Sequence, residues 1–324
     1  MSNAELNPQT SPHIAKQLDV PTLAVMIPTL NRPHDLLIAV QTLLDQTRLP
    51  QELIIIDQST SDKSERQLRA LFAEHSERMP HFELRYTRDP RISGLAEARN
   101  VALGQNRCNV ILFLDDDVEL EADFVERLLE GYADDPGVTG ISGIITNYKP
   151  AGFAFRAWQW IFVHGSFRDD RQPIYYRANE LRHAGRIEVS RLGGGLMSFR
   201  SDRIRDVHFD SNLRGPSEGE DVDFCLHLPA GSRLQIDPRA RLVHNASTVA
   251  RKDEHWNASV VRGSSYLFYR NWRRGIIDRF AFLWLMSGFG LLSLAASVKR
   301  SSVAPWKEFT AALRYGREVG SGPR

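Results

Sequence analysis

The first 130 residues alternate short apolar runs with segments whose apolar residues recur at helical spacing. The run at 22–30 precedes a helical pattern that starts near Pro33, and the run at 53–56 precedes a second one. A third cycle leads from 82–88 into 94–106, and 110–114 is a fourth apolar run. Strands that alternate with helices predict an α/β fold with a mostly parallel central sheet flanked by helices.

Beyond residue 138 the pattern changes to shorter strand-like pieces separated by loops. They read VTGISGIIT, RIEVSRLGGGLMSFR and ARLVHN. Three consecutive glycines, Gly193 to Gly195, interrupt the second piece, which suits a bend where a ligand or another backbone approaches closely.

The chain divides into three parts by composition. Residues 1–20 are polar, contain proline and lack the apolar core of a secretory signal, so we expect a disordered leader. Residues 21–250 form the main domain. Residues 251–324 form a helical extension with 13 Lys and Arg against 5 Asp and Glu, which gives it a charge of about +8 against about −7 for the rest.

The segment 280–298 is 19 residues long and carries no charge. As a helix it would extend roughly 28 Å, close to the thickness of a bilayer core. Arginines and a lysine flank both of its ends, so the sequence assigns no orientation. We expect it to span or embed in a membrane; the alternative is a buried core helix with small residues at its packing face.

Cysteine usage and charge limit the possible classes of protein. Cys108 and Cys225 are the only cysteines and form no CxxC pattern, so no disulfide framework or thiolate zinc site is indicated and a reducing compartment is expected. The basic residues of the extension are interleaved with apolar ones, which fits a membrane surface better than nucleic acid.

Polar side chains follow three of the predicted strands. Thr29 and Asn31 come after the first, Asp57 after the second, and Asp115 to Asp117 after the fourth. Ligands of such sheets bind beyond the carboxyl ends of the strands, so these residues should converge. Three adjacent carboxylates repel one another unless a cation is present, which suggests Mg²⁺ or Mn²⁺; the alternative is a solvated turn before a helix.

A second acidic cluster occurs in GPSEGEDVDFCLHL, which contains Glu218, Glu220, Asp221 and Asp223. A loop that delivers carboxylates to a helix start can supply a general base, although acidic helix caps are also common. His244 ends a strand-like run, where it is either structural or a ligand beside a carboxylate-bound metal.

Six stretches together resemble glycosyltransferase family 2, whose members have the GT-A fold and use nucleotide-diphosphate sugars. They are VMIPTLNRPHDL, LIIIDQSTSD, GLAEARNVAL, FLDDDV, GGGLMSFR and GEDVDFCLHL, in the family's order and approximate spacing. The resemblance covers about residues 22 to 250. It implies a GT-A-type domain at 21–250, and the composition of 251–324 predicts a C-terminal helical, membrane-associated extension after it.

The resemblance also implies a role for individual residues. Asp221 would be the catalytic base, with Glu220 as the fallback, and Asp57 would contact the nucleotide base. Asp117 would bind Mn²⁺ or Mg²⁺, with Asp115 and His244 completing the site. The donor would be bound by Pro28, Thr29, Asn31, Asp57, Gly94, Arg99, Asp115 and Asp116, and the acceptor by Gly194, Gly195 and Trp158.

The resemblance further implies an inverting transfer from a UDP-, dTDP- or GDP-sugar to a glycan or lipid-linked glycan. Because the apolar segment 280–298 would keep the enzyme near a lipid-linked glycan, we expect it to serve bacterial envelope or exopolysaccharide assembly at the cytoplasmic face of the plasma membrane. The QxxRW motif of processive synthases is absent, so we expect the addition of one sugar or a few. Gln58 departs from the family's usual Asn or Asp. The alternatives are a sugar nucleotidyltransferase and a catalytically inactive, membrane-associated binding scaffold.

Overall fold

A computed structural model describes residues 20–78, 82–213, 219–245 and 256–323. The predicted leader, apart from Val20, lies outside these residues, as do Glu218 and the predicted boundary at 250/251. The strands are β1 (Leu23–Thr29), β2 (Glu52–Asp57), β3 (Glu83–Arg88), β4 (Val110–Leu114), β5 (Val118–Leu120), β6 (Gly140–Ile145), β7 (Ile187–Val189), β8 (Leu196–Arg200) and β9 (Leu234–His244). The α-helices are α1 (Pro33–Leu44), α2 (Lys63–His75), α3 (Leu95–Gln105), α4 (Phe124–Asp134), α5 (Phe153–Phe162), α6 (Gln172–Tyr175), α7 (Glu220–Leu226), α8 (Trp256–Leu267), α9 (Ile276–Lys299) and α10 (Ala304–Ser321).

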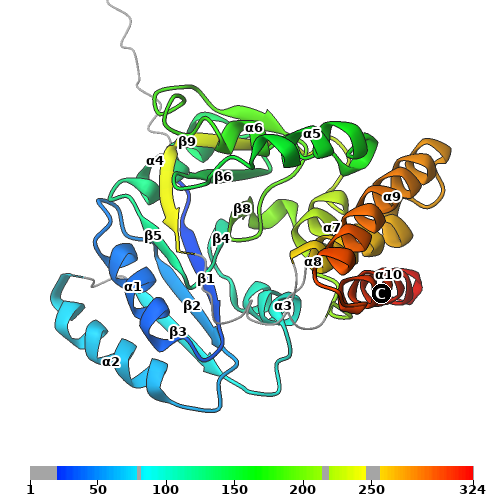
Figure 1. The fold of residues 1–324 in the computed structure, drawn as a ribbon. Coiled ribbons are helices and arrows are strands. Elements are labelled where there is room, and N and C mark those ends of the chain that lie inside the picture. Colours follow the sequence, from blue (N-terminus) through cyan, green and yellow to red (C-terminus); the bar gives the residue numbers. More distant parts are fainter. Residues whose placement is uncertain (1–19, 79–81, 214–218, 246–255, 324) are drawn as a thin grey trace, which may run out of the picture.

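One mixed sheet runs through the main domain in the order β3-β2-β1-β4-β8-β6-β9-β5, with β7 beside β9 (Figure 1). The pairs among β1 to β4 are parallel, as the alternation of strands and helices predicted. The later, shorter pieces form the other half, where β8 runs antiparallel to both β4 and β6. The α/β architecture expected from the sequence is therefore confirmed.

Both faces of the sheet are covered, which explains why β1 has no exposed residue. Leu23, Val25 and Ile27 face the helices α1, α2 and α4. Ala24 and Met26 face α3 and α7 on the opposite side. Strands buried on both faces read as continuous apolar runs, and this is the pattern found in the sequence.

The C-terminal helices α8, α9 and α10 pack together through an apolar cluster that includes Phe268, Phe282 and Phe289. They also bind the main domain, because Tyr266 donates a hydrogen bond to Asp210 and Asn271 donates one to Asp223 of α7. The segment 280–298 lies within α9, the one helix of the described residues that is long and apolar enough to cross a membrane. The predicted helical extension is confirmed, and its inner face is part of the protein core.

Candidate active site

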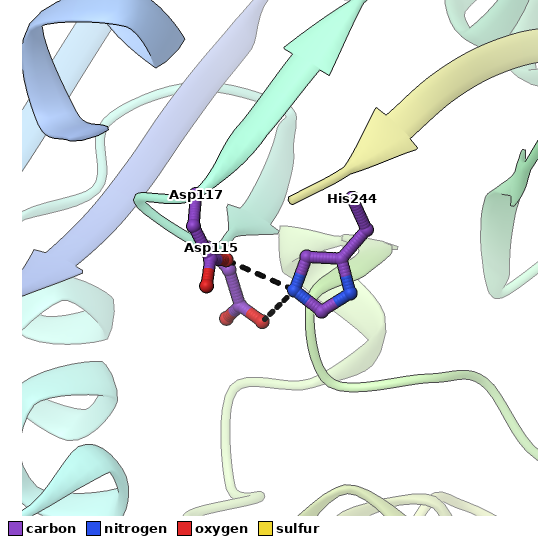
Figure 2. Close-up of side chains that lie close together, drawn as sticks. All are labelled: Asp115, Asp117 and His244. Atoms are coloured by element: carbon purple, nitrogen blue, oxygen red, sulfur yellow. Dashed lines mark hydrogen bonds and ion pairs between the residues drawn. The ribbon is translucent and has the colours of Figure 1, made fainter. Parts of the chain in front are cut away.

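The acidic turn after β4 points its carboxylates in two directions. Asp115 and Asp117 face the His244 ring (Figure 2). Asp116, between them in sequence, turns away: it accepts a hydrogen bond from Thr29 Oγ1 at 2.7 Å and from Arg32 Nη1 at 2.9 Å. Asp115 and Asp117 therefore share access to the His244 ring, whereas Thr29 and Arg32 hold Asp116 inside the fold.

His244 reaches this turn because β9 pairs antiparallel with β5, which places the histidine opposite Val118. Its Nε2 lies 2.9 Å from Oδ1 of Asp117 and 3.9 Å from Oδ2 of Asp115 (Figure 2). The ligating atoms of the three residues all lie within 4.8 Å of one another. Two carboxylates and one imidazole are a donor set that suits a divalent ion such as Mn²⁺, so the residues fit a metal.

Burial makes negative charge costly in this turn. It raises the pKa of Asp116 to about 6, despite the hydrogen bond from Thr29 and the charge of Arg32. Burial also raises the pKa of Asp115, which Arg99 and His244 oppose. A divalent cation between Asp115 and Asp117 would offset this cost by adding positive charge to that of Arg99 and His244.

The described part of the second acidic cluster lies in the first turn of α7, and Glu220, the first residue of this helix, is buried. Glu220 accepts a hydrogen bond from Arg99 Nη1 at 2.9 Å, and the other terminal nitrogen of that arginine donates to Gly194 O at 2.7 Å. The same nitrogen, Nη2, lies 3.7 Å from Asp115 Oδ1. Burial and the neighbouring charge of Asp221 raise the pKa of Glu220 to about 8. One buried guanidinium thus connects the metal-site turn, the glycine run and α7.

Asp221 is more accessible, with 17 % of its side chain exposed against 6 % for Glu220. Its Oδ2 accepts hydrogen bonds from Arg171 Nη1 at 3.1 Å and from Gly194 N at 3.2 Å. Arg171 in turn is fixed by Asp169, whose Oδ1 lies 2.9 Å from its Nε. Asp221 is therefore held at a defined position at the surface of the site.

The glycine run is needed for space. A Cβ on Gly195 would lie 2.5 Å from Oδ2 of Asp115, and a Cβ on Gly194 would lie 3.1 Å from Arg99 and 3.2 Å from Glu220. The sequence predicted the close approach of a ligand or another backbone here, and the structure shows that the side chains of Asp115, Arg99 and Glu220 approach the two glycines.

The polar residues at the ends of β1 and β2 also come together. Thr29 is opposite Asp57 in the parallel register. Asp57 is fully buried and accepts hydrogen bonds from Ser59 N at 2.8 Å and Tyr86 Oη at 2.5 Å. The backbone N–H of Asn31, which has a φ of 56°, donates to Ser59 Oγ.

Three further predicted donor or acceptor residues have defined structural contacts. Pro28 is buried within β1. Gly94, at the N-cap of α3 with a φ of 94°, donates its N–H to Gln58 Oε1, so the unusual Gln58 connects two loops of the site. The centroid of the Trp158 ring lies 4.7 Å from that of Phe289 in α9, so this ring packs on the C-terminal helices. The role of Trp158 toward an acceptor stays a prediction.

Sequence reasoning did not single out Arg32, Arg171 or Asp169. Arg32 follows the predicted loop residue Asn31 directly, so its closeness to the same sheet edge was a usable signal. Arg171 is 50 positions from Asp221, and no local pattern in RDDRQP reveals that partner.

A cavity of about 850 Å³ in the described part of the chain lies away from this site. It lies beside Asn109 and Pro21, at the amino ends of β4 and β1, and contains none of the clustered carboxylates. The carboxyl ends of the strands, where α/β sheets bind ligands, carry the chemistry instead.

Comparison with known proteins identifies the family. A sequence model of glycosyl transferase family 2 matches residues 24–202, more than half of the chain, so the chain belongs to this family. It is also 29 % identical over 173 residues to proteins named pre-mycofactocin glycosyltransferase from two strains of Mycobacterium tuberculosis. The match covers 53 % of this chain and 34 % of theirs, so the chain matches about a third of the length of these relatives. The chain therefore contains a domain of glycosyl transferase family 2.

Solved structures confirm the fold. A mannosyltransferase from Pyrobaculum calidifontis, described in complex with GDP-Man and Mn²⁺, aligns with a TM-score of 0.54 at 14 % identity, over 93 % of this chain and 85 % of that one. Residues 1–349 of TarS from S. aureus, described in complex with UDP-GlcNAc, align with a TM-score of 0.53 at 12 % identity, over 92 % and 90 %. These neighbours show that the chain has the GT-A fold.

Proposed function

We propose that the protein transfers one sugar, with inversion, from a nucleotide-diphosphate sugar to an acceptor hydroxyl. The observation that carries the proposal is the contact chain Asp115–Arg99–Glu220, which joins the candidate metal site to the loop and helix that present Asp221. A site for a metal-bound diphosphate and a carboxylate able to accept a proton thus belong to one rigid network.

Asp221 is the base in this proposal. A general base must reach the proton that it removes, and Asp221 is partly exposed, whereas Glu220 is buried against Arg99. Asp221 takes the proton of the acceptor hydroxyl as the oxygen attacks the anomeric carbon, opposite the departing diphosphate. One displacement from the opposite side inverts the configuration. Gly194 N–H and Arg171 orient the carboxylate for this step.

Asp115, Asp117 and His244 hold the metal in this proposal. The imidazole favours Mn²⁺ over Mg²⁺, which prefers oxygen ligands alone. When bound, the ion neutralises charge on the leaving diphosphate. Arg32, which lies 3.4 Å from Asp117 Oδ2, adds positive charge beside the same carboxylate.

The donor is a UDP-, dTDP- or GDP-sugar. Structural neighbours described with GDP-Man and UDP-GlcNAc support a nucleotide sugar of this kind. Thr29, Asn31 and Asp57 would border the nucleotide at the ends of β1 and β2, with Pro28, Gly94 and Asp116 shaping the same pocket. Gly194, Gly195 and Trp158 would face the acceptor.

The acceptor is a glycan or a lipid-linked glycan of bacterial envelope or exopolysaccharide assembly. We place the enzyme on the cytoplasmic side of the plasma membrane, attached through the C-terminal helices; the apolar character of α9 supports this. The main domain at 21–250 would carry the chemistry.

A panel of UDP-, dTDP- and GDP-sugars, with and without Mn²⁺, tests the proposal. We expect one donor to release nucleoside diphosphate in a metal-dependent reaction, with the free sugar formed initially as the inverted anomer by NMR. Retention of configuration would contradict the single displacement. Release from no donor would favour the inactive-scaffold alternative.

A further inference from the structure

Helix α9 has one face inside the protein and one apolar face outside it. Leu285 and Phe289 are buried in the cluster shared with α8 and α10. On the opposite side, Phe280 is 69 % exposed and Leu283 is 64 % exposed. The large exposed apolar residues of the helix are spread along its length, with steps of one, three, four or seven positions: Ile276, Ile277, Phe280, Leu283, Trp284, Leu291, Leu294 and Val298.

Helix α5 extends this outer surface. Its exposed apolar residues are Phe153, Trp160 and Ile161. Trp284 Nε1 donates a hydrogen bond to Ile161 O at 2.7 Å, which joins the two helices at their exposed sides. We call the exposed apolar residues of α5 and α9 the α5–α9 face. Both helices lie at the same end of the molecule (Figure 1).

Unpaired positive charge borders the α5–α9 face. Arg273, Arg274 and Arg279 line a shallow pocket of about 380 Å³ together with apolar and aromatic side chains, among them Leu283 of the face. All three arginines are exposed, and none forms an ion pair with a carboxylate in the described part of the chain. The only acid of α9, Asp278, accepts a hydrogen bond from Ser166 Oγ at 2.7 Å. The pocket therefore offers guanidinium groups to an anion beside an apolar surface.

We propose that the α5–α9 face docks on a bilayer of anionic phospholipid, with a headgroup phosphate in the pocket of Arg273, Arg274 and Arg279. α9 would lie in the plane of the interface, because its inner face is buried in the protein from Ala281 to Ser293 and a spanning helix would have to leave that core. Aromatic side chains such as Trp160 and Trp284 suit the headgroup level. The inference deepens the membrane attachment proposed above and is independent of the transfer chemistry.

Charge favours this occupant over a second copy of the chain. A symmetric dimer through the α5–α9 face would bring its own unpaired arginines toward one another, whereas an anionic surface attracts them. Guanidinium groups also bind phosphate oxygens with two parallel hydrogen bonds. The apolar face of a second copy has no acceptor oxygens to replace these phosphates.

Sedimentation of the full chain with vesicles tests the proposal. We expect binding to phosphatidylglycerol vesicles, weaker binding to phosphatidylcholine vesicles, and loss of the difference at high salt. Replacement of Arg273, Arg274 and Arg279 by glutamine should weaken binding to phosphatidylglycerol about five-fold for each arginine. A matched control removes the same charge elsewhere: Arg66→Gln, Arg69→Gln and Arg107→Gln should bind like the wild type.

A second variant tests the apolar part of the face. Leu283→Glu with Leu294→Glu changes two exposed side chains, so the fold should persist and binding to both kinds of vesicle should be lost. Failure of the wild type to bind phosphatidylglycerol would overturn the proposal, as would equal binding by the arginine triple variant. A wild-type dimer in solution that the leucine variant converts to a monomer would assign the face to a second copy instead.

Release of nucleoside diphosphate without vesicles separates this inference from the proposed function. We expect both variants to keep wild-type turnover in solution, because neither touches the acidic clusters. Turnover by a wild type that does not bind vesicles would contradict the docking proposal and leave the proposed transfer intact. Vesicle binding without turnover of any donor contradicts the proposed transfer alone.

Discussion

Replacing Gly195 by alanine would add a methyl group 2.5 Å from Oδ2 of Asp115. Ordinary contacts of a Cβ begin near 3.4 Å, so the carboxylate has to move by about 0.9 Å. It cannot do so without changing the geometry that it shares with Asp117 and His244, whose ligating atoms lie within 4.8 Å of its own. Disturbing the groups that orient metal ligands typically weakens metal binding 10- to 100-fold, and we expect a loss of about this size for Mn²⁺.

The assay is a Mn²⁺ titration of nucleoside diphosphate release, together with direct calorimetric binding of Mn²⁺ in the presence of the nucleoside diphosphate. Gly104→Ala is the matched control, because its new methyl group would meet nothing within 4 Å. We expect the control to bind Mn²⁺ like the wild type. If folded Gly195→Ala also bound Mn²⁺ with wild-type affinity, the assignment of Asp115 to the metal site would be refuted.

Three further predictions concern residues around the acidic clusters. Arg171 contacts Asp221 and not the metal triad, so Arg171→Gln should lower kcat about 10-fold with an unchanged Kd for the donor. Arg171→Lys should recover part of this loss. A loss of donor affinity in Arg171→Gln instead would contradict a positioning role. Burial raises the pKa of Glu220 above its unfolded value, so the folded state favours the protonated acid and loses stability as pH rises from about 4.5 to about 8. Denaturant melts should show a smaller loss over this range for Glu220→Gln, and an identical slope would refute the shift. Phe224→Ala should reduce the free energy of unfolding by about 3–5 kcal/mol, because the buried ring stacks on Phe209 at 4.3 Å; a change below about 1 kcal/mol in urea melts would contradict the packing account.

The parts of the fold that depend on local sequence could be predicted from it. Continuous apolar runs gave β1, β2 and β4 because buried parallel strands need them, and the acidic turn was visible because it follows β4 directly. The convergence of Thr29, Asp57 and Asp116 could be predicted because the carboxyl ends of parallel strands lie at the same edge of the sheet.

Contacts between distant segments could not be predicted in this way. The role of Arg99 toward the donor stays a prediction, and the contact that the sequence did not indicate is the hydrogen bond of its guanidinium to Glu220, which is 121 positions away. Nothing local distinguishes the orientation of Asp116 from that of its neighbours. The sequence also left open whether 280–298 is core or membrane segment; the structure shows that one face of α9 is core while the other is exposed.

The comparison of wild type with Asp221→Asn tests the central claim most directly. Asparagine keeps the size of the side chain and a carbonyl oxygen for the Gly194 N–H, but it cannot take a proton. For the donor that the wild type uses, we predict a fall in metal-dependent kcat of about 10²- to 10⁴-fold with an unchanged Kd for the donor. Wild-type kcat in Asp221→Asn would contradict Asp221 as the base.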